Sequence, residues 1–497
     1  MKLLAFGSNG SGQLGIGHTD DVSQPTPCLF LDSSEDRQSR PAESRTEETE
    51  IVKKNLLAQN ASPDLLDEIV HIATGGNHTL VLTARGHVYA AGCNLDGRCG
   101  PDYDYYNSND ENSTSAYSSS EKNLLNFRRV VLTDPVTGTA VRTFKHVAAT
   151  WEGSILVSRR PVNAPESSPR SENAPNSQDT VYVLGSTPKG ELGLGSGDTQ
   201  APTSTPTPAS ASIPAFPPHG TSIVGLASGM GHAVAILCTG EVYGWGAARK
   251  GQLGDGNKPA KILWTPTRVD GIPFRASGAS CGREFTVVFG DCKRGEFVVL
   301  GDRGNRWGVL DGPLHFSSVG DTPMTANLSA EENKGSESYL QQSVEGRGNP
   351  YTSLSTSWNG VYVHTAPNQA FSSLPSTSTS THLPPHTSPL PSASSEKSDA
   401  GLLIAWGRND RGQLPPPNLP TPIKLAVGSE HALALLGDGQ VAAFGWGEHG
   451  NCGPDTDVRG NVAGTYNVVA LPGGVCVGGA RVVGVGAGCA TSWVMVT

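Results

Sequence analysis

Residues 245–254 read WGAARKGQLG, one copy of a loop pattern that recurs along the whole chain. An apolar strand leads into a glycine, four variable residues, a second glycine, a polar residue, an apolar residue and a third glycine. Four further copies keep this order: FGSNGSGQLG from Phe6, AGCNLDGRCG from Ala91, LGSTPKGELG from Leu184 and FGWGEHGNCG from Phe444. Two degenerate copies, WGRNDRGQLP from Trp406 and LGDRGNRWGVL from Leu300, bring the count to seven. A repeat of this length decides the architecture before any single residue does.

A second pattern precedes each loop, namely a turn of small residues followed by an alternating strand. Its clear copies begin at Ile72, Val147, Leu226, Ala276, Leu425 and Val483. Before Trp406 the pattern is poor, and WNGVYVHT from Trp358 is the nearest candidate. Alternation with a period of two residues, closed by tight turns, predicts antiparallel hairpins.

These hairpins predict blades that must stack, because a single blade cannot bury both of its faces. The chain begins inside a blade, at the strand Leu3–Phe6, and ends with the strand Cys489–Val496, which elsewhere precedes the loop. The last strand therefore supplies what the first blade lacks. We predict an all-β fold, a single seven-bladed β-propeller over residues 1–497, closed by pairing of the N- and C-terminal strands.

The composition agrees with short strands and tight turns. Glycine accounts for 61 of 497 residues, about 12%, and charged residues for 16%; typical values are about 7% and about 25%. No apolar run reaches the ~18 residues of a membrane span, and the opening MKLLAFGSNG is too short for a signal peptide. The nine cysteines include no C-x-x-C pair, which disfavours a zinc ribbon or a disulfide framework. We expect a cytoplasmic, and also nuclear, protein with no membrane contact.

Five stretches between the repeats are too polar to pack. They are residues 32–60, 101–122, 161–179, 196–220 and 312–400, rich in Ser, Thr, Pro, Asn or charged residues. Such composition buries too little apolar surface to offset the chain entropy lost on folding. We predict that all five are disordered insertions at blade connections.

Three loop and strand positions have structural interpretations. The second loop glycine should need positive φ or close backbone approach, at Gly12, Gly97, Gly190, Gly251, Gly412 and Gly450. The apolar residue two places later should plug the gap between blades, at Leu14, Cys99, Leu192, Leu253, Leu414 and Cys452. A recurring histidine, at His78, His232 and His431, should make a structural hydrogen bond between blades, since equivalent positions in a ring are too far apart to share a metal.

No catalytic constellation is found. The glycine strings lack the Lys-Ser/Thr and the helix of a phosphate loop, and no nucleophile elbow occurs. We therefore predict no enzyme activity, no cofactor and no bound metal. The net charge of −10 also disfavours direct nucleic-acid binding.

The candidate partner-binding residues lie in the loops of one rim, where Trp and Arg are typical of binding hot spots. They are Arg249, Lys250, Arg303, Arg306, Trp307, Arg408, Trp446, Glu448 and His449. The alternative is that these are solvated loop tips, with Trp307 and Trp446 packed between blades.

The loop G-x-N-x-x-G-Q-L-G with the strand A-x-G-x-x-H-T/A-L resembles the regulator-of-chromosome-condensation repeat, which implies a seven-bladed propeller. Residues 5–18 (AFGSNGSGQLGIGH), 445–453 (GWGEHGNCG) and 488–493 (GCATSW) further resemble the fungal alpha-tubulin suppressor, or killer-toxin-insensitivity, family. That resemblance implies a non-enzymatic adaptor that binds a small zinc-binding protein of the diphthamide pathway. It would support diphthamide synthesis on elongation factor 2 and, with the Elongator complex, tRNA wobble-uridine modification.

The alternative is a guanine-nucleotide exchange factor for a Ran-like small GTPase, the activity of the founding member of the repeat family. Against it, the sequence shows no basic N-terminal tail, no recognisable inserted β-wedge and an acidic balance. Because exchange needs no catalytic triad, the lack of one does not exclude this alternative.

Overall fold

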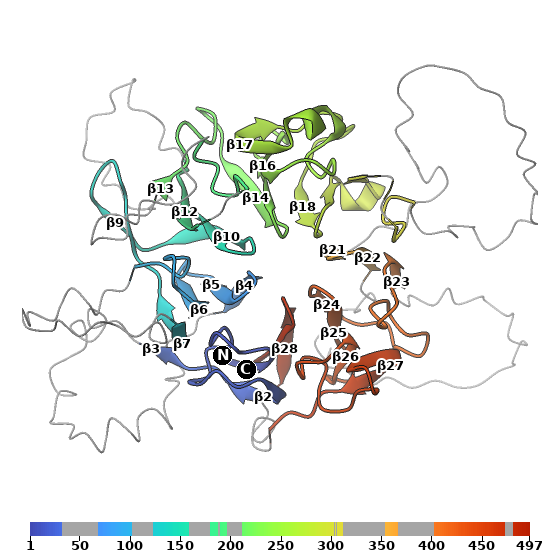
Figure 1. Cartoon of the computed structure of the whole chain (residues 1–497). Coiled ribbons are helices and arrows are strands. Elements are labelled where there is room, and N and C mark those ends of the chain that lie inside the picture. The colour runs from blue at the N-terminus through green and yellow to red at the C-terminus, as the bar shows by residue number, and fades with distance from the viewer. Residues whose placement is uncertain are drawn as a thin grey trace, which may run out of the picture.

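The fold is a closed ring of seven β-sheets around a central axis (Figure 1). A computed structural model describes residues 1–31, 68–101, 123–158, 179–186, 189–195, 211–302, 304, 306–311, 353–365, 402–472 and 481–497. Within these residues, every sheet of three or more strands is one blade, and the predicted seven-bladed propeller is confirmed.

The blades are numbered around the ring, and the strands of each run from the axis outward. Blade 1 consists of β28 (Val482–Ala487), β29 (Thr491–Val496), β1 (Lys2–Gly7) and β2 (Val22–Pro27). Blade 2 consists of β4 (Ile69–Thr74), β5 (His78–Thr83), β6 (Val88–Cys93) and β7 (Asn123–Arg129), with β3 (Phe30–Leu31) parallel to β7 at its edge. Blade 3 consists of β10 (Phe144–Ala149), β11 (Gly153–Ser158), β12 (Val181–Gly185) and β13 (Ala211–Ser212).

The remaining blades follow in chain order. Blade 4 consists of β14 (Ile223–Ser228), β15 (His232–Leu237), β16 (Val242–Ala247) and β17 (Ile262–Arg268). Blade 5 consists of β18 (Gly278–Cys281), β19 (Thr286–Phe289) and β20 (Phe297–Leu300), and blade 6 of β21 (Ser353–Ser357), β22 (Gly360–Thr365) and β23 (Leu402–Gly407). Blade 7 consists of β24 (Lys424–Val427), β25 (His431–Leu435), β26 (Val441–Trp446) and β27 (Asn461–Val468). Outside the blades lie a small hairpin, β8 (Leu132–Thr133) with β9 (Ala140–Val141), and two 3-10 turns, η4 (Asp255–Ala260) and η5 (Cys292–Arg294).

The ring closes through its two termini, as predicted. Strand β1 pairs antiparallel with β29 over its whole length, from Lys2 opposite Val496 to Gly7 opposite Thr491. The N- and C-termini therefore lie side by side in one blade (Figure 1). This pairing leaves no free edge between the first and last parts of the chain, which is how a propeller protects its sheets.

The loop after the third strand keeps its shape through three repeated features. The second loop glycine has φ between +75° and +82° in all six predicted copies, so the expected positive φ is confirmed. The loop asparagine accepts a hydrogen bond from the amide five residues later, as Asn9 does from Leu14 at 3.0 Å. The loop glutamine accepts one from the amide two residues earlier, as Gln252 does from Lys250 at 2.8 Å.

The apolar loop residue fills the space between neighbouring blades in five of the six predicted copies. Leu14, Cys99, Leu192, Leu253 and Cys452 are buried in apolar clusters whose other members come from two adjacent blades. The prediction is wrong for Leu414, which is only half-buried. The following residue there is Pro415, which cannot adopt the positive φ of the glycine that ends the other loops.

Each of the recurring histidines makes a hydrogen bond to the next blade, as predicted. The Nε2 atoms of His78, His232 and His431 each lie 2.9 Å from a hydroxyl of the next blade. The hydroxyls belong to Ser154, Thr286 and Ser492. Burial lowers the pKa of His78 to about 3 and the pKa values of His232 and His431 to about 4, so the three rings are neutral in the fold.

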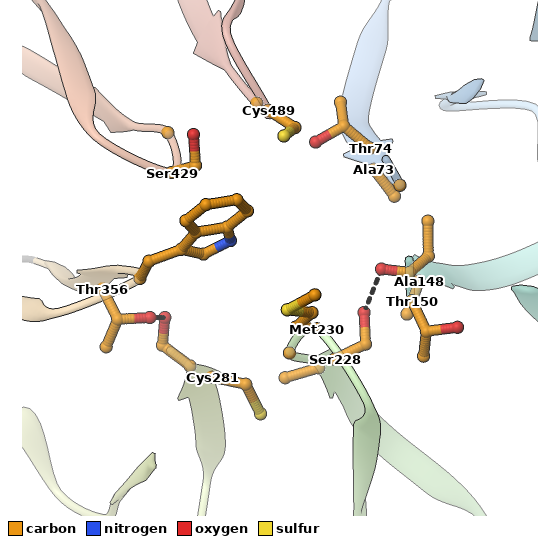
Figure 2. Close-up of a pocket in the computed structure, with 18 of the residues that line it drawn as sticks. Ala73, Thr74, Ala148, Thr150, Ser228, Met230, Cys281, Thr356, Ser429 and Cys489 are labelled. Carbon is orange, nitrogen blue, oxygen red and sulfur yellow. Dashed lines mark hydrogen bonds between the residues drawn. The ribbon is translucent and has the colours of Figure 1, made fainter. Parts of the chain in front are cut away.

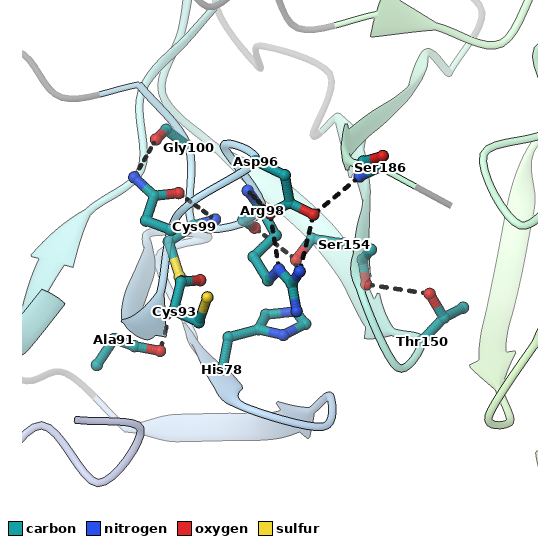
Figure 3. A network of polar contacts seen from close by, with 12 residues as sticks. His78, Ala91, Cys93, Asp96, Arg98, Cys99, Gly100, Thr150, Ser154 and Ser186 are labelled. Carbon is teal, nitrogen blue, oxygen red and sulfur yellow. Dashed lines mark hydrogen bonds and ion pairs between the residues drawn. The ribbon is translucent and has the colours of Figure 1, made fainter. Parts of the chain in front are cut away.

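A polar network reinforces the boundary between blades 2 and 3 (Figure 3). Ser154 donates to the carbonyl of Arg98 at 2.7 Å while it contacts His78. The guanidinium of Arg98 makes two hydrogen bonds to Asp96, at 2.7 and 2.8 Å. Asp96 also accepts the amide of Ser186 at 3.1 Å, so one carboxylate joins two blades.

Two of the predicted insertions are too long. Residues 211–220 contain β13, and the side chains of Ile213 and Phe216 are buried against blades 3 and 4. Residues 353–365 form β21 and β22, which are the inner strands of blade 6. In both places a few alternating buried side chains, such as Leu354 and Thr356, lie inside a stretch whose average composition is polar. The rest of 196–220 and 312–400, and nearly all of 32–60, 101–122 and 161–179, lie outside the described residues.

Candidate functional site

Two kinds of connection emerge on one face of the propeller, which we call the loop face. They are the turns between the first and second strands of each blade and the loops between the third and fourth. Because neighbouring strands of a blade run antiparallel, both connections lie at the same end of the blade. The opposite face carries the turns between second and third strands.

A row of alternating arginine and tryptophan side chains crosses the loop face from blade 5 to blade 7. Two guanidinium groups stack on the ring of Trp307, and their central carbons lie 4.5 Å (Arg306) and 4.9 Å (Arg408) from the ring centroid. Trp307 follows β20 of blade 5, whereas Arg408 follows β23 of blade 6, so the stack bridges two blades. Stacked guanidinium and indole groups attract one another electrostatically as well as by contact.

Glu430 anchors the middle of this row. Its buried carboxylate forms ion pairs with both Arg408 and Arg411, the latter at 3.2 Å. Burial is the main influence on Glu430 and raises its pKa, against the opposing effect of the two arginines. Arg408 also binds Asp410, at 2.6 Å, and this hydrogen bond lowers the pKa of Asp410. The two guanidinium groups are thereby held in fixed positions.

The row continues to the junction of blades 7 and 1. The guanidinium of Arg411 lies 5.2 Å from the ring of Trp446. The indole N–H of Trp446 donates to Glu448 at 3.0 Å, and its ring meets the edge of His449 at 5.2 Å. His449 in turn pairs with Asp21 of blade 1 at 2.7 Å. We call the set Arg306, Trp307, Arg408, Arg411, Trp446 and His449, with Glu430 beneath it, the Arg–Trp row.

The structure therefore brings together six of the nine predicted partner-binding residues. Arg306, Trp307, Arg408, Trp446, Glu448 and His449 lie in or beside the row. Trp307 and Trp446 are both half-buried, and Trp307 packs against the apolar cluster between blades 5 and 6, as the alternative interpretation expected. Arg249 and Lys250 lie on the same face in the loop of blade 4, and no hydrogen bond or ion pair among the described residues joins them to the row. Arg303 lies outside the described residues.

The sequence interpretation missed a second group of side chains, at the mouth of the central channel. They share one position in the first turn of each blade, and Trp151, Met230, Trp358, Ser429 and Cys489 at this position line the central cavity. The other two blades carry Gly76 and Arg283 at this position. The rings of Trp151 and Trp358 meet at 5.8 Å although they belong to blades 3 and 6, and Arg283 stacks on Trp358 at 5.5 Å. The available signal was a bulky residue where other repeats carry a small one.

The channel forms an open cavity of about 270 Å³ that is lined by the inner strands and first turns of all seven blades. Figure 2 shows Thr74, Thr150, Ser228, Thr356 and the thiols of Cys281 and Cys489 around the space. Burial raises the pKa of Cys281 to about 12 and that of Cys489 to about 11, so both thiols stay protonated at neutral pH. The cavity offers neutral hydrogen-bonding groups and no activated nucleophile.

Nothing in the described residues forms an active site. The pair His78 and Ser154 has the distance of a catalytic dyad, yet both side chains are buried and the arrangement recurs at two other blade boundaries. In the same part of the chain, no group of three or more His, Cys, Asp or Glu side chains is placed to hold a metal ion. No described helix has the length and hydrophobicity to cross a membrane.

Comparison with known proteins agrees with this geometry. Models of the regulator of chromosome condensation (RCC1) repeat match residues 239–289, 69–98 and 423–451, which fall in blades 4 and 5, 2 and 7. The chain is an RCC1-like propeller. The RCC1 repeat-containing protein C10F6.04 of Schizosaccharomyces pombe is 24% identical and aligns over 99% of this chain and 98% of its own length. The mouse secretion-regulating guanine nucleotide exchange factor is also 24% identical, over 95% of this chain and 79% of its own.

Solved structures show the same fold. Human WBSCR16 superposes with a TM-score of 0.56 at 14% identity, over 99% of this chain and 98% of that chain. Prp20p of Saccharomyces cerevisiae, a structure described with its binding to Gsp1p and histones, gives a TM-score of 0.53 at 16% identity, over 99% and 90%. At identities this low, the likeness shows that the RCC1-like propeller shares the architecture of these proteins.

Proposed function

We propose that this RCC1-like propeller is a non-enzymatic adaptor that binds another protein through its loop face. The Arg–Trp row carries the proposal, because it places arginine and tryptophan side chains across three blades and on to a fourth, with no catalytic group beside them. Arginine and tryptophan are the residues that contribute most binding energy at protein interfaces. A rigid ring of sheets holds them in a fixed geometry, which lowers the entropy lost on binding.

The partner in this proposal is a small zinc-binding protein of the diphthamide pathway, through which the adaptor supports diphthamide synthesis and Elongator-dependent modification of wobble uridine. Three stretches that resemble the alpha-tubulin suppressor family support it, because the fold brings them together. The amide of Ser8 donates to the carbonyl of Ala490 at 2.8 Å, and Ser492 donates to the carbonyl of Asn451 at 2.8 Å. Metal chemistry would then belong to the partner.

A second candidate is guanine-nucleotide exchange on a Ran-like small GTPase. It is favoured by the mouse and bovine relatives, which are named secretion-regulating guanine nucleotide exchange factors. An exchange factor displaces contacts to nucleotide and magnesium, so it needs a docking surface and no triad of its own. The same loop face could serve such a partner.

Affinity capture of the full chain from cells, followed by mass spectrometry, separates the two candidates. The adaptor function predicts recovery of a small zinc protein together with Elongator subunits. Stable capture of a GTPase in nucleotide-free extract, released by added GTP, would support exchange instead. Recovery of neither class of protein would contradict both.

A deletion strain provides an independent test. The adaptor function predicts loss of wobble-uridine modification in total tRNA, with restoration by the wild-type chain. Normal modification in the deletion strain would contradict the adaptor function. The proposal also places the protein in the cytoplasm and nucleus, which microscopy of a fluorescent fusion would test.

A further inference from the structure

The channel-mouth position is free to vary because the backbone, not the side chain, holds the turn. The amide of Trp151 donates to the carbonyl of Met230 at 3.1 Å, and the amide of Trp358 donates to the carbonyl of Ser429 at 2.9 Å. Arg283 makes the same kind of bond to Trp358, at 3.0 Å. These main-chain bonds link neighbouring blades whatever the side chain is. The side chains at this position are therefore available for binding.

Their sizes divide the ring into two arcs. Trp151, Met230, Arg283 and Trp358 stand on the consecutive blades 3 to 6, whereas blades 7, 1 and 2 carry Ser429, Cys489 and Gly76. The bulky arc lies on the same face as the Arg–Trp row, and the two share blades 5 and 6. Main-chain hydrogen bonds connect the two groups, because Arg283 bonds to Trp358 and Trp358 bonds to Ser429, the residue before Glu430. Together they form one surface from the axis to the rim.

Two arginines on this surface have no carboxylate partner within the part of the chain that the structure describes. Arg408 and Arg411 are neutralised by Asp410 and Glu430. By contrast, Arg283 and Arg306 are exposed and form no ion pair with any described residue. Each is stacked on a tryptophan, which orients the guanidinium while leaving its N–H groups able to donate. One stands at the channel mouth and the other toward the rim.

The same stacking disfavours single-stranded nucleic acid as the occupant. Base recognition on a protein surface needs an open aromatic face. Here Arg283 stacks on the ring of Trp358, which also contacts the tilted ring of Trp151, and both Arg306 and Arg408 stack on the ring of Trp307. A short acidic stretch can pair with the two guanidinium groups and needs no open aromatic face.

We propose that this surface docks an acidic segment of a partner protein. Its carboxylates pair with Arg283 and Arg306, and its apolar atoms contact Met230 and the parts of Trp307 and Trp358 that stay exposed beside the stacked arginines. The proposal deepens the proposed function, since it names the chemistry that the adaptor recognises. Glu430 acts as a positioning residue, because it holds Arg408 under Trp307. Arg408 and Arg411 are already neutralised by carboxylates, so the incoming acid pairs with Arg283 and Arg306, which form no ion pair with a described residue.

Fluorescence anisotropy of the full chain with a labelled oligoglutamate peptide tests this directly. We expect binding that weakens as salt is raised, and none with an oligoglutamine peptide of equal length. The double variant R283E/R306E should lose at least about tenfold in affinity, because it places like charges opposite the ligand. The matched control is R294E, since Arg294 is exposed on the same blade but at η5 on the opposite face.

Four results would overturn the proposal: no binding of oligoglutamate, equal binding by R283E/R306E, an equal loss in R294E, or preferential binding of a single-stranded RNA of similar charge. Circular dichroism and the unfolding midpoint check that the double variant is folded. If it is unfolded, R283Q/R306Q, which removes the two positive charges without adding negative ones, takes its place. Affinity capture keeps the two proposals apart. If the double variant recovers the zinc protein as well as wild type does, the surface is wrong and the adaptor function stands. If oligoglutamate binds but no zinc protein is recovered, the surface stands and the adaptor function falls.

Discussion

Blade 4 and blade 6 are built on the same repeat, but blade 4 keeps the residues that pack against its neighbours whereas blade 6 has lost several of them. Blade 4 has four strands, a buried His232 that bonds to the next blade and a loop plug, Leu253, that is fully buried. Blade 6 has three described strands, Gly360 where the histidine would stand, and a half-buried Leu414. Yet blade 6 supplies Trp358, Arg408 and Arg411 to the loop face.

The comparison separates two roles within one repeat. Residues that face a neighbouring blade must fill a closely packed space. They can be replaced only where other bonds hold the two blades together. Positions at the loop face are constrained by little within the fold, and large side chains collect there. A repeat that looks degenerate can therefore be the one that carries the binding surface.

The largest expected effect distinguishes the two loop plugs. Leu253→Asp places a carboxylate in the apolar cluster between blades 4 and 5 and should destabilise the protein by about 4 kcal/mol or more. Leu414→Asp, at the half-buried equivalent position of blade 6, should cost about 1 kcal/mol. Denaturant unfolding of both variants measures the difference, and equal losses would contradict the distinction between the blades.

The next effect concerns pH. Since burial lowers the pKa of His232 from 6.5 to about 4, the unfolded chain takes up a proton below pH 6.5 while the folded chain does not. Stability is thus unaffected above pH 6.5 and falls between pH 6.5 and 4, by about 3 kcal/mol for this residue.

Blade 5 supplies the control substitution, because Phe285 occupies the position of the histidine there. His232→Phe should remove this share of the acid sensitivity. It should also cost about 1 kcal/mol at every pH, because the hydrogen bond to Thr286 is lost while the Thr286 hydroxyl still donates to the sulfur of Cys281. Unfolding midpoints measured across this pH range give the comparison. An unchanged pH slope in the variant would show that His232 is not kept neutral by burial.

A smaller effect is expected at the anchor of the Arg–Trp row. Glu430→Gln removes the charge that holds Arg408 and Arg411 and should cost about 1 to 2 kcal/mol of stability, since Arg408 keeps Asp410. Thermal unfolding measures the loss, and quenching of tryptophan fluorescence by iodide reports whether Trp307 and Trp446 become more accessible. Unchanged quenching would show that the row does not depend on its anchor.

The smallest effect belongs to the exposed pair at the ring closure. Asp21→Asn removes the ion pair with His449 but keeps an oxygen able to accept the amide of Asn9, which lies 2.6 Å from Asp21. The cost should stay below about 1 kcal/mol, as for other solvent-exposed pairs. A loss as large as that of Glu430→Gln in the same unfolding assay would show that the closure relies on this contact.

The sequence predicted the features that follow from the repeat, and it missed those that depart from it. The blade count, the pairing of termini and the bridging role of His78, His232 and His431 followed from periodicity, because equivalent positions in a ring have equivalent neighbours. The inner strands of blade 6 were missed because their buried residues, such as Leu354 and Thr356, alternate within a Ser- and Thr-rich stretch. Arg283 and Trp358 were missed for a similar reason, since each looks like a defect in its own repeat.

Local periodicity in the amino-acid sequence determined that this protein is a ring of seven blades and which loop positions demand glycine. The fold alone decided that Trp151 meets Trp358 across the axis, that Arg408 and Arg306 both stack on Trp307, and that Glu430 joins two arginines. The physical reason is distance along the chain. Hydrogen bonds and steric limits act between neighbours and repeat with the sequence, whereas the contacts that form a surface join residues from different repeats, and only ring closure brings those together.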